Sequence, residues 1–130
     1  MLKKDALILV VDDDRDFLEI FSAKLNAQGY KTATALDGIE AVEKAKQVKP
    51  TVILMDIQMP KKDGVQAMLD LIADEETKKI PIIFLTSLGD AALSELNRKF
   101  AKQIGARDYF RKSDNYDILM SRISSLVSTH

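Results

Sequence analysis

Short apolar runs alternate with amphipathic stretches along the whole chain. Five runs have the length of a β-strand and are bounded by polar or turn residues. The first, third and fourth are continuously apolar, which is typical of strands buried on both faces of a parallel sheet, whereas the second and fifth are mixed, as edge strands often are. The predicted strands cover residues 6–11, 30–35, 51–55, 80–85 and 107–112.

A stretch whose apolar residues recur at the spacing of one helix face follows each run. Gly29 is well placed to end the first of these helices, and Pro50 to end the second. The five predicted helices lie within residues 15–29, 37–50, 64–76, 90–105 and 115–128.

This alternation predicts an α/β fold, namely a doubly wound parallel sheet with right-handed crossovers. The pattern accounts for the 130 residues without a linker or a repeat, so we expect a single domain over residues 1–130. A chain of this length buries roughly two-thirds of the surface that its unfolded form exposes, which is enough for a substantial core.

Composition and charge exclude several classes of protein. Nineteen Lys and Arg against 20 Asp and Glu leave a net charge of −1, without the basic excess of a general nucleic-acid binder. The absence of cysteine excludes disulfides and thiolate chemistry. The apolar run from Ala6 to Val11 is too short for a signal peptide or a membrane span. We therefore expect a cytoplasmic protein without a membrane partner.

Polar side chains gather where the predicted strands end. Parallel strands present these ends at one edge of the sheet, which is where ligands bind in this class of fold. The groups are Asp12, Asp13 and Asp14 after the first strand, Asp56 after the third, Thr86 and Ser87 after the fourth, and Lys112 after the fifth.

Such a cluster of carboxylates favours a divalent cation. Two carboxylates about 4 Å apart repel by roughly 4 kcal/mol at an effective dielectric constant of 20. Mg²⁺ relieves this repulsion and is usually held by one or two carboxylates together with phosphate oxygens. The pattern thus indicates phosphoryl chemistry with Asp56 as nucleophile, assisted by the Lys112 ammonium and the Thr86 hydroxyl. Pro60, by fixing φ, and Gly64, by allowing a conformation closed to other residues, suit a stiff turn over the site.

Each group also has a simpler explanation. Asp14 and Thr86 could cap helices, Asp56 could be a turn residue, and Lys112 could be a solvated edge lysine. The site is favoured because four strand ends all supply groups that are useful to one reaction.

With these motifs identified, the chain resembles the receiver domain of two-component response regulators over essentially its whole length. The stretches that carry the resemblance are "ILVVDDD", "LMDIQMPKKDG", "IIFLTS" and "GARDYFRKS". The resemblance implies a flavodoxin-like fold with five helices and a five-stranded sheet in the order 2-1-3-4-5.

The resemblance also implies a metal site and a phosphoacceptor. Asp56 matches the phosphoacceptor. Asp13 matches the direct ligand of Mg²⁺ (or Mn²⁺), and Asp12 would act through water. Gln58 would add its backbone carbonyl.

The switch residues follow in the same way. Thr86 matches the switch hydroxyl, Lys112 the lysine of the family, and Tyr109 the switch aromatic, for which a partly buried edge-strand tyrosine is the simpler alternative. A sensor histidine kinase or phosphotransfer protein would phosphorylate Asp56. Thr86 would then move, Tyr109 would swing inward, and the face of the fourth helix, fifth strand and fifth helix would be remodelled for a downstream target or output domain. The same face is a possible homodimer surface.

The chain departs from the family pattern in its last third. Ser113 stands where the family usually has proline, which leaves open whether the Lys112–Ser113 bond is trans or a strained cis bond. The 26 positions from Thr86 to Lys112 exceed the usual spacing by about one helical turn of 3.6 residues, which predicts a longer fourth helix and an altered partner surface. An apolar Leu88 is expected to exclude the hydrolysing water.

Two charged residues occupy positions where some family members form salt bridges across a dimer, Asp108 and Arg122. Two solvated surface charges are the simpler alternative.

Three other functions compete with a receiver. A phosphohydrolase of the haloacid dehalogenase type needs an acid where this chain has Gln58. An FMN binder needs a phosphate loop rich in Ser, Thr and Gly after the first strand, where this chain has "DDDRD". A receiver-like adaptor that is never phosphorylated is the third. We expect a phosphoacceptor signalling domain rather than an enzyme, although one that assists its own phosphotransfer and autodephosphorylation.

Overall fold

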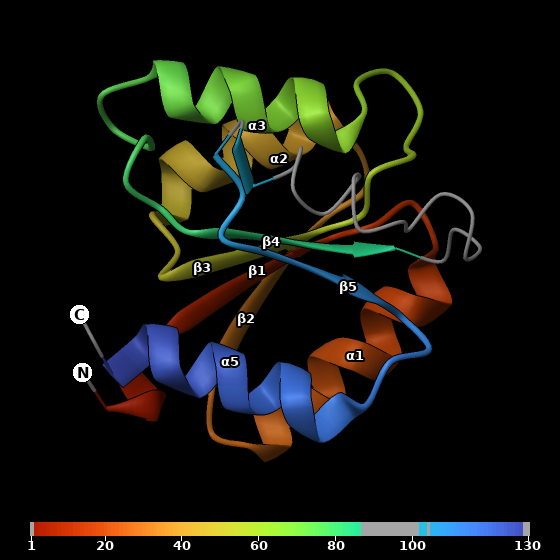
Figure 1. The fold of residues 1–130 in the computed structure, drawn as a ribbon, viewed down its shortest axis with the longest axis vertical. Helices are drawn as coiled ribbons and strands as arrows, with labels where there is room; N and C mark the ends of the chain where they lie inside the picture. Colours follow the sequence, from red (N-terminus) through yellow and green to blue (C-terminus); the bar gives the residue numbers. More distant parts are fainter. Residues whose placement is uncertain (1, 87–101, 104, 129–130) are drawn as a thin grey trace.

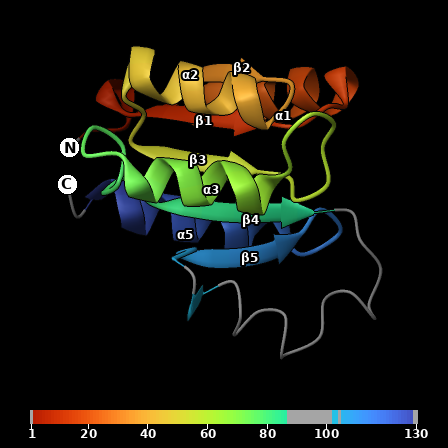
Figure 2. The ribbon, with the colours of Figure 1, turned by 90° about the horizontal axis from the view of Figure 1, so that it is seen from above.

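The computed structural model describes residues 2–86, 102–103 and 105–128. Its five strands form one parallel sheet in the order β2-β1-β3-β4-β5, with all carboxyl ends at the same edge (Figure 2). The predicted sheet and its order are therefore confirmed. The strands are β1 (Leu7–Val11), β2 (Lys31–Ala35), β3 (Val52–Met55), β4 (Ile82–Thr86) and β5 (Asp108–Arg111).

Two layers of helices enclose this sheet. Helices α2 and α3 cover one face and α1 and α5 the other (Figure 1). The described residues contain four α-helices rather than the five predicted, because the helix expected within 90–105 lies almost wholly outside them, as do Ser87 and Leu88. The helices are α1 (Arg15–Ala27), α2 (Gly38–Val48), α3 (Gly64–Ala73) and α5 (Tyr116–Ser128), preceded by a short 3₁₀ turn, η1 (Lys3–Asp5).

The central strands are apolar throughout because both of their faces are buried. In β1, Ile8 and Val10 belong to the core under α1 and α5, whereas Leu9 and Val11 belong to the core under α2 and α3. All four are at most 1% exposed. The two mixed runs form β2 and β5, the edges of the sheet, as their patterns predicted.

Local signals set the ends of α1. The Asp14 side chain accepts hydrogen bonds from the backbone N–H groups of Asp16 and Phe17, at 3.0 and 3.2 Å. Asp14 therefore caps the helix, which was the simpler of the two roles considered for it. After the helix ends, Gly29 has a φ of +101°, which glycine adopts readily. The start of α1 is thereby fixed next to the end of β1.

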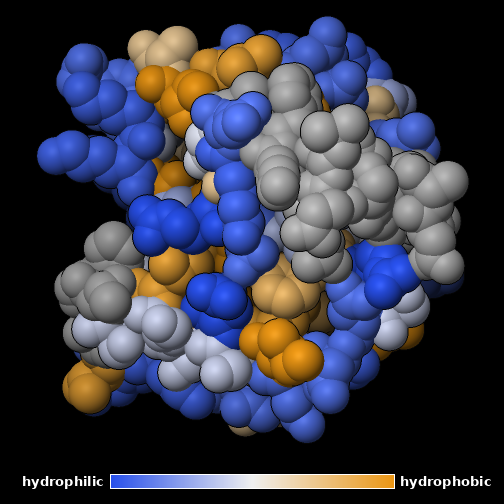
Figure 3. Space-filling view, in the orientation of Figure 1, coloured by the Kyte–Doolittle hydropathy of each residue, from blue (hydrophilic) through white to orange (hydrophobic). Residues whose placement is uncertain are grey.

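The surface seen in Figure 3 is mostly hydrophilic. An apolar patch interrupts it between β5 and α5, in the lower half of that view. Ile118 of α5 is 56% exposed, and it lines a shallow hollow together with Phe110 of β5.

Candidate functional site

The ends of the two central strands bring carboxylates together. Val11 of β1 pairs with Met55 of β3, so Asp12 and Asp56 follow neighbouring residues, and the Asp56 N–H donates to the Val11 carbonyl at 2.9 Å. Oxygens of Asp12, Asp13 and Asp56, which we call the aspartate cluster, all lie within 4.8 Å of one another. Asp12 and Asp56 are 1% and 6% exposed, whereas Asp13 faces solvent.

Lys112 reaches this cluster from the end of β5. Its backbone N–H donates to the Thr86 carbonyl at 2.7 Å, which ties the loop after β5 to the end of β4. Its Nζ lies 2.5 Å from Asp12 Oδ2 and 3.7 Å from Asp56 Oδ2. The contact with Asp12 is an ion pair. Lys112 is therefore part of the site and not a solvated edge residue.

The absence of proline after Lys112 does not prevent this reach. The Lys112–Ser113 peptide bond is trans. The lysine side chain is only 18% exposed and still contacts two carboxylates. The structure therefore has a trans bond before Ser113 and not the strained cis bond that was the other possibility.

The electrostatics of the site act against ionisation of Asp56. Burial is the largest cause that raises the pKa of Asp56, and the charge of Asp12 raises it further. The Lys112 ammonium and the Ile57 N–H, which donates to Asp56 Oδ1 at 2.7 Å, lower the pKa in part, and Asp13 raises it again. Three carboxylates facing one ammonium leave an excess of negative charge, so these oxygen donors fit a hard divalent cation such as Mg²⁺.

A tight turn closes the site on the side of α3. The Gly64 N–H donates to the Ile57 carbonyl at 2.7 Å, and a capping box of Asp63 and Gln66 begins the helix. A Cβ on Gly64 would lie 2.3 Å from the Asp56 carbonyl oxygen. The expected reason for Gly64 was wrong: in this turn the positive φ, 68°, belongs to Lys61, and glycine is needed at Gly64 because there is no space for a side chain.

Gly64→Ala should therefore destabilise the protein, by at least about 2 kcal/mol, because backbone atoms must move to admit the methyl group. Helix propensity alone predicts the opposite sign, a gain of about 0.5–1 kcal/mol from replacing glycine by alanine. Urea unfolding measures the difference. A Gly64→Ala variant more stable than the wild type would show that the turn yields easily.

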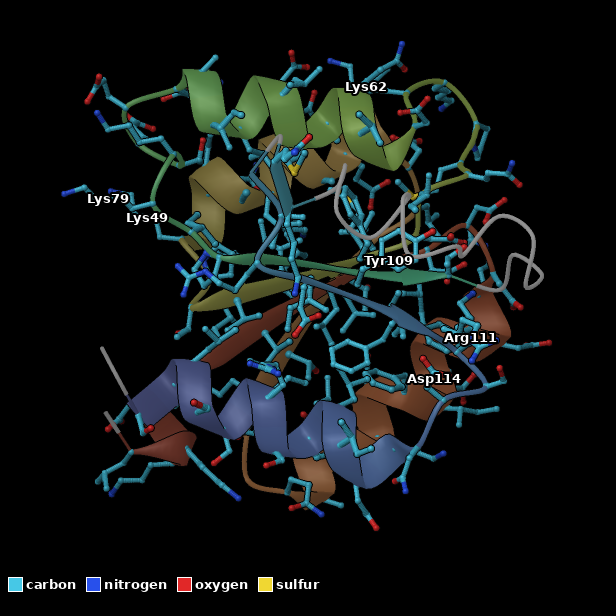
Figure 4. The ribbon with its side chains drawn as sticks, in the orientation of Figure 1. Lys49, Lys62, Lys79, Tyr109, Arg111 and Asp114 are labelled. Carbon is cyan, nitrogen blue, oxygen red and sulfur yellow. The ribbon has the colours of Figure 1, made fainter. Side chains whose placement is uncertain are left out.

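The two predicted switch residues lie on β4 and β5. Thr86 ends β4 and is fully buried. Tyr109 is 3% exposed and stands beside Phe84 of β4, with ring centroids 6.3 Å apart and planes at 69° (Figure 4). The tyrosine thus occupies an inward position in the core under α2 and α3. Gln58 lies exposed in the loop two residues after Asp56.

The pair assigned to a dimer contact is joined within the chain. Arg122 Nε of α5 lies 3.0 Å from Asp108 Oδ2 of β5, and Asp108 is 8% exposed. The alternative of a solvated charge is therefore wrong for Asp108, although the Arg122 side chain is 53% exposed, and a bridge across a dimer would have to replace this ion pair. Arg111 and Asp114 form a second such pair, with 3.0 Å between Nε and Oδ1, at the end of β5 (Figure 4).

Sequence reasoning missed one contact of the site. Lys112 Nζ lies 4.1 Å from the centroid of the Phe17 ring, at the start of α1. Phe17 falls in the amphipathic stretch predicted as a helix within residues 15–29, where an apolar residue fits a core role, and its aromatic ring was the only signal of a second role.

The comparisons with known proteins point to one family. The family model described as "Response regulator receiver domain" matches residues 8–124. The chain is 36% identical to Protein PilH of Pseudomonas aeruginosa, covering 95% of this chain and 98% of that protein.

Solved structures show the same fold. The receiver domain of the Francisella response regulator 1452 matches with a TM-score of 0.85 at 28% identity, over 96% of this chain and 98% of that one. The receiver domain of the sensor histidine kinase PA1611 from Pseudomonas aeruginosa, solved with a magnesium ion in its active-site cleft, matches with a TM-score of 0.81 at 31% identity, over 95% and 98%. Within the described residues of our chain, every helix is too short or too polar to cross a membrane.

Proposed function

The chain belongs to the response regulator receiver domain family, and on that premise we propose that residues 1–130 form a single receiver domain whose phosphoacceptor is Asp56. This family consists of signalling domains rather than classical enzymes. The observation that carries the proposal is the aspartate cluster with oxygens within 4.8 Å of one another and the Lys112 ammonium against two of its members.

The donor is a phosphohistidine on a sensor histidine kinase or a phosphotransfer protein. An Asp56 carboxylate oxygen forms the new P–O bond while the P–N bond to the imidazole breaks. The imidazole leaves with the electron pair of that bond and takes up a proton from water. Lys112 supports the step because its ammonium neutralises a phosphoryl oxygen, and the Thr86 hydroxyl donates to another.

The residues that would hold Mg²⁺ (or Mn²⁺) are Asp13, Asp56 and the backbone carbonyl of Gln58, with Asp12 acting through water. The bound ion would neutralise charge on the phosphoryl group as it is transferred. The donor set fits, because it consists of oxygens and carries more negative charge than Lys112 offsets.

The acyl phosphate adds charge beside Thr86 and so biases a switch at β4 and β5. Tyr109 already lies inward in this structure. Phosphorylation would stabilise that position, in which the face of β5 and α5 meets a downstream protein or an output domain. The apolar patch between β5 and α5 supports a protein partner on this face, and a homodimer is a second use of it. We place this reaction in the cytoplasm and assign the chain no direct nucleic-acid or membrane contact. Water ends the signal by hydrolysing the acyl phosphate.

Acetyl phosphate tests the proposal without a kinase. Incubation with Mg²⁺ should add the mass of one phosphoryl group, measured by intact mass spectrometry. A chelator should suppress the gain, and hydroxylamine should remove it, because acyl phosphates react with that nucleophile. A chain that gains no mass with acetyl phosphate and Mg²⁺ would instead be an adaptor that works without phosphorylation.

A further inference from the structure

We propose that Phe17 is a positioning residue for phosphotransfer, whose ring directs the Lys112 ammonium toward the aspartate cluster. This inference rests on the proposed function of Asp56. Lys112 Nζ stands 4.1 Å from the Phe17 ring centroid and 2.5 Å from Asp12 Oδ2. The ammonium therefore has a carboxylate on one side and an aromatic ring on another, and both attract a cation.

The ring itself is held in place. The backbone N–H of Phe17 donates to the Asp14 cap at 3.2 Å, which fixes its position in the first turn of α1. Its ring stacks on Phe21 one turn later, with centroids 5.2 Å apart and planes at 16°. Phe21 in turn meets Tyr116, the first residue of α5, edge to face at 6.2 Å. The position of the Phe17 ring beside Lys112 is thus fixed by packing between α1 and α5.

The Lys112 side chain also has space for a second position, away from the aspartate cluster. A hollow of about 170 Å³, which is room for several waters, opens beside the lysine between α1 and the start of α5. Phe17 and Tyr116 belong to its lining, as does Asp114, whose carboxylate pairs with Arg111. Because a lysine chain has four flexible carbons, losing the ring of Phe17 would let the charge turn away from Asp56.

A double-mutant cycle tests whether Phe17 acts through Lys112. Initial rates of phosphorylation by acetyl phosphate at saturating Mg²⁺ are measured for the wild type, Phe17→Leu, Lys112→Ala and the double variant. Phe17→Leu keeps apolar bulk but removes the ring, so we expect it to slow the wild type roughly three- to thirtyfold. In the Lys112→Ala background the same change should alter the rate less than about twofold, because the group on which the ring acts is gone.

Two further variants separate positioning from packing. Phe17→Trp should keep the rate close to that of the wild type, because tryptophan offers the best face to a cation. Phe21→Leu, which disturbs the same stack without touching Lys112, should slow the reaction less than Phe17→Leu. Mg²⁺ affinity, measured by calorimetry, should not fall in Phe17→Leu, because the ring supplies no oxygen ligand and holds the ammonium that competes with the metal.

The position of the lysine is visible without phosphorylation. The ε-methylene protons of Lys112 should resonate upfield in the wild type because of the Phe17 ring current, lose that shift in Phe17→Leu and keep it in Phe21→Leu. Equal slowing by Phe17→Leu in both backgrounds, or no ring-current shift, would overturn the inference and leave the proposed function intact. A wild-type protein that accepts no phosphoryl group would overturn the proposed function first, and the role of Phe17 with it.

Discussion

Asp56→Asn should take up no phosphoryl group from acetyl phosphate and should also melt at a higher temperature than the wild type at neutral pH. The first effect follows because an amide oxygen is too weak a nucleophile to form the acyl phosphate. The second follows from burial beside like charges: Asp56 is 6% exposed, and its cluster partners lie within 4.8 Å. Two carboxylates at that separation repel by roughly 3 kcal/mol at an effective dielectric constant of 20, before Lys112 offsets part of this.

The stabilisation should depend on pH in a defined direction. The pKa of Asp56 is raised in the folded protein above its ordinary value of 3.8, so the folded state holds this proton more tightly than the unfolded state does. The contribution of Asp56 to stability is therefore fully present below pH 3.8 and is lost as the pH rises through the raised pKa. The melting-temperature advantage of Asp56→Asn should grow over the same range and then level off.

Thermal unfolding in a chelating buffer from acidic to neutral pH measures this advantage. A net gain of 1 kcal/mol corresponds to about 3–6 °C for a domain of this size. Asp5→Asn is the matched control, because Asp5 is exposed and precedes β1, at the opposite end of the strand from the cluster, and it should shift the melting temperature little at any pH. An Asp56→Asn variant less stable than the wild type at neutral pH would contradict the raised pKa.

Lys112→Ala should slow phosphoryl uptake by about 10²–10³-fold, the usual cost of removing one charge-stabilising donor from a reaction site. The carboxylates of Asp12 and Asp56 lose their ammonium at 2.5 and 3.7 Å. The pKa of Asp56 should therefore rise further, and Mg²⁺ should bind at least as tightly as before, since less positive charge competes for the cluster. A slower reaction with undiminished Mg²⁺ binding would show that Lys112 stabilises the phosphoryl group during its transfer.

Acetyl phosphate kinetics and Mg²⁺ calorimetry on the same samples give both quantities. Lys62→Ala is the control, because Lys62 pairs with Asp70 on the protein surface and should leave both values near those of the wild type. If Lys112→Ala reacted at the rate of the wild type, the lysine would be only a counter-ion of the cluster and its catalytic role would be lost.

The sheet and the cluster were predictable from the sequence because they depend on strong one-dimensional signals. Continuous apolar runs mark buried strands, and residues that follow parallel strands must share one edge. Asp12, Asp56 and Lys112 meet for that reason. Strand-end position therefore predicted which residues approach one another, although not the distances between their atoms.

The contacts that the sequence did not reveal depend on side-chain direction and on local space. Phe17 fits an apolar helix stripe equally well whether or not a lysine lies against its ring. Gly64 is required by the nearness of the Asp56 carbonyl, which no turn statistic encodes. Arg122 and Asp108 could equally have pointed into solvent, and only the packing of α5 beside β5 joins them.

The crowded junction at Gly64 has a mechanical consequence. The carbonyl of Asp56 abuts Gly64, and the next carbonyl along the chain, that of Ile57, is hydrogen-bonded to the Gly64 amide. The start of helix α3 therefore packs directly against the backbone of Asp56 and Ile57, and it resists movement of this backbone toward α3. We expect the conformational change that follows phosphorylation to occur on the side of Thr86 and β5. The side of α3 should keep its structure.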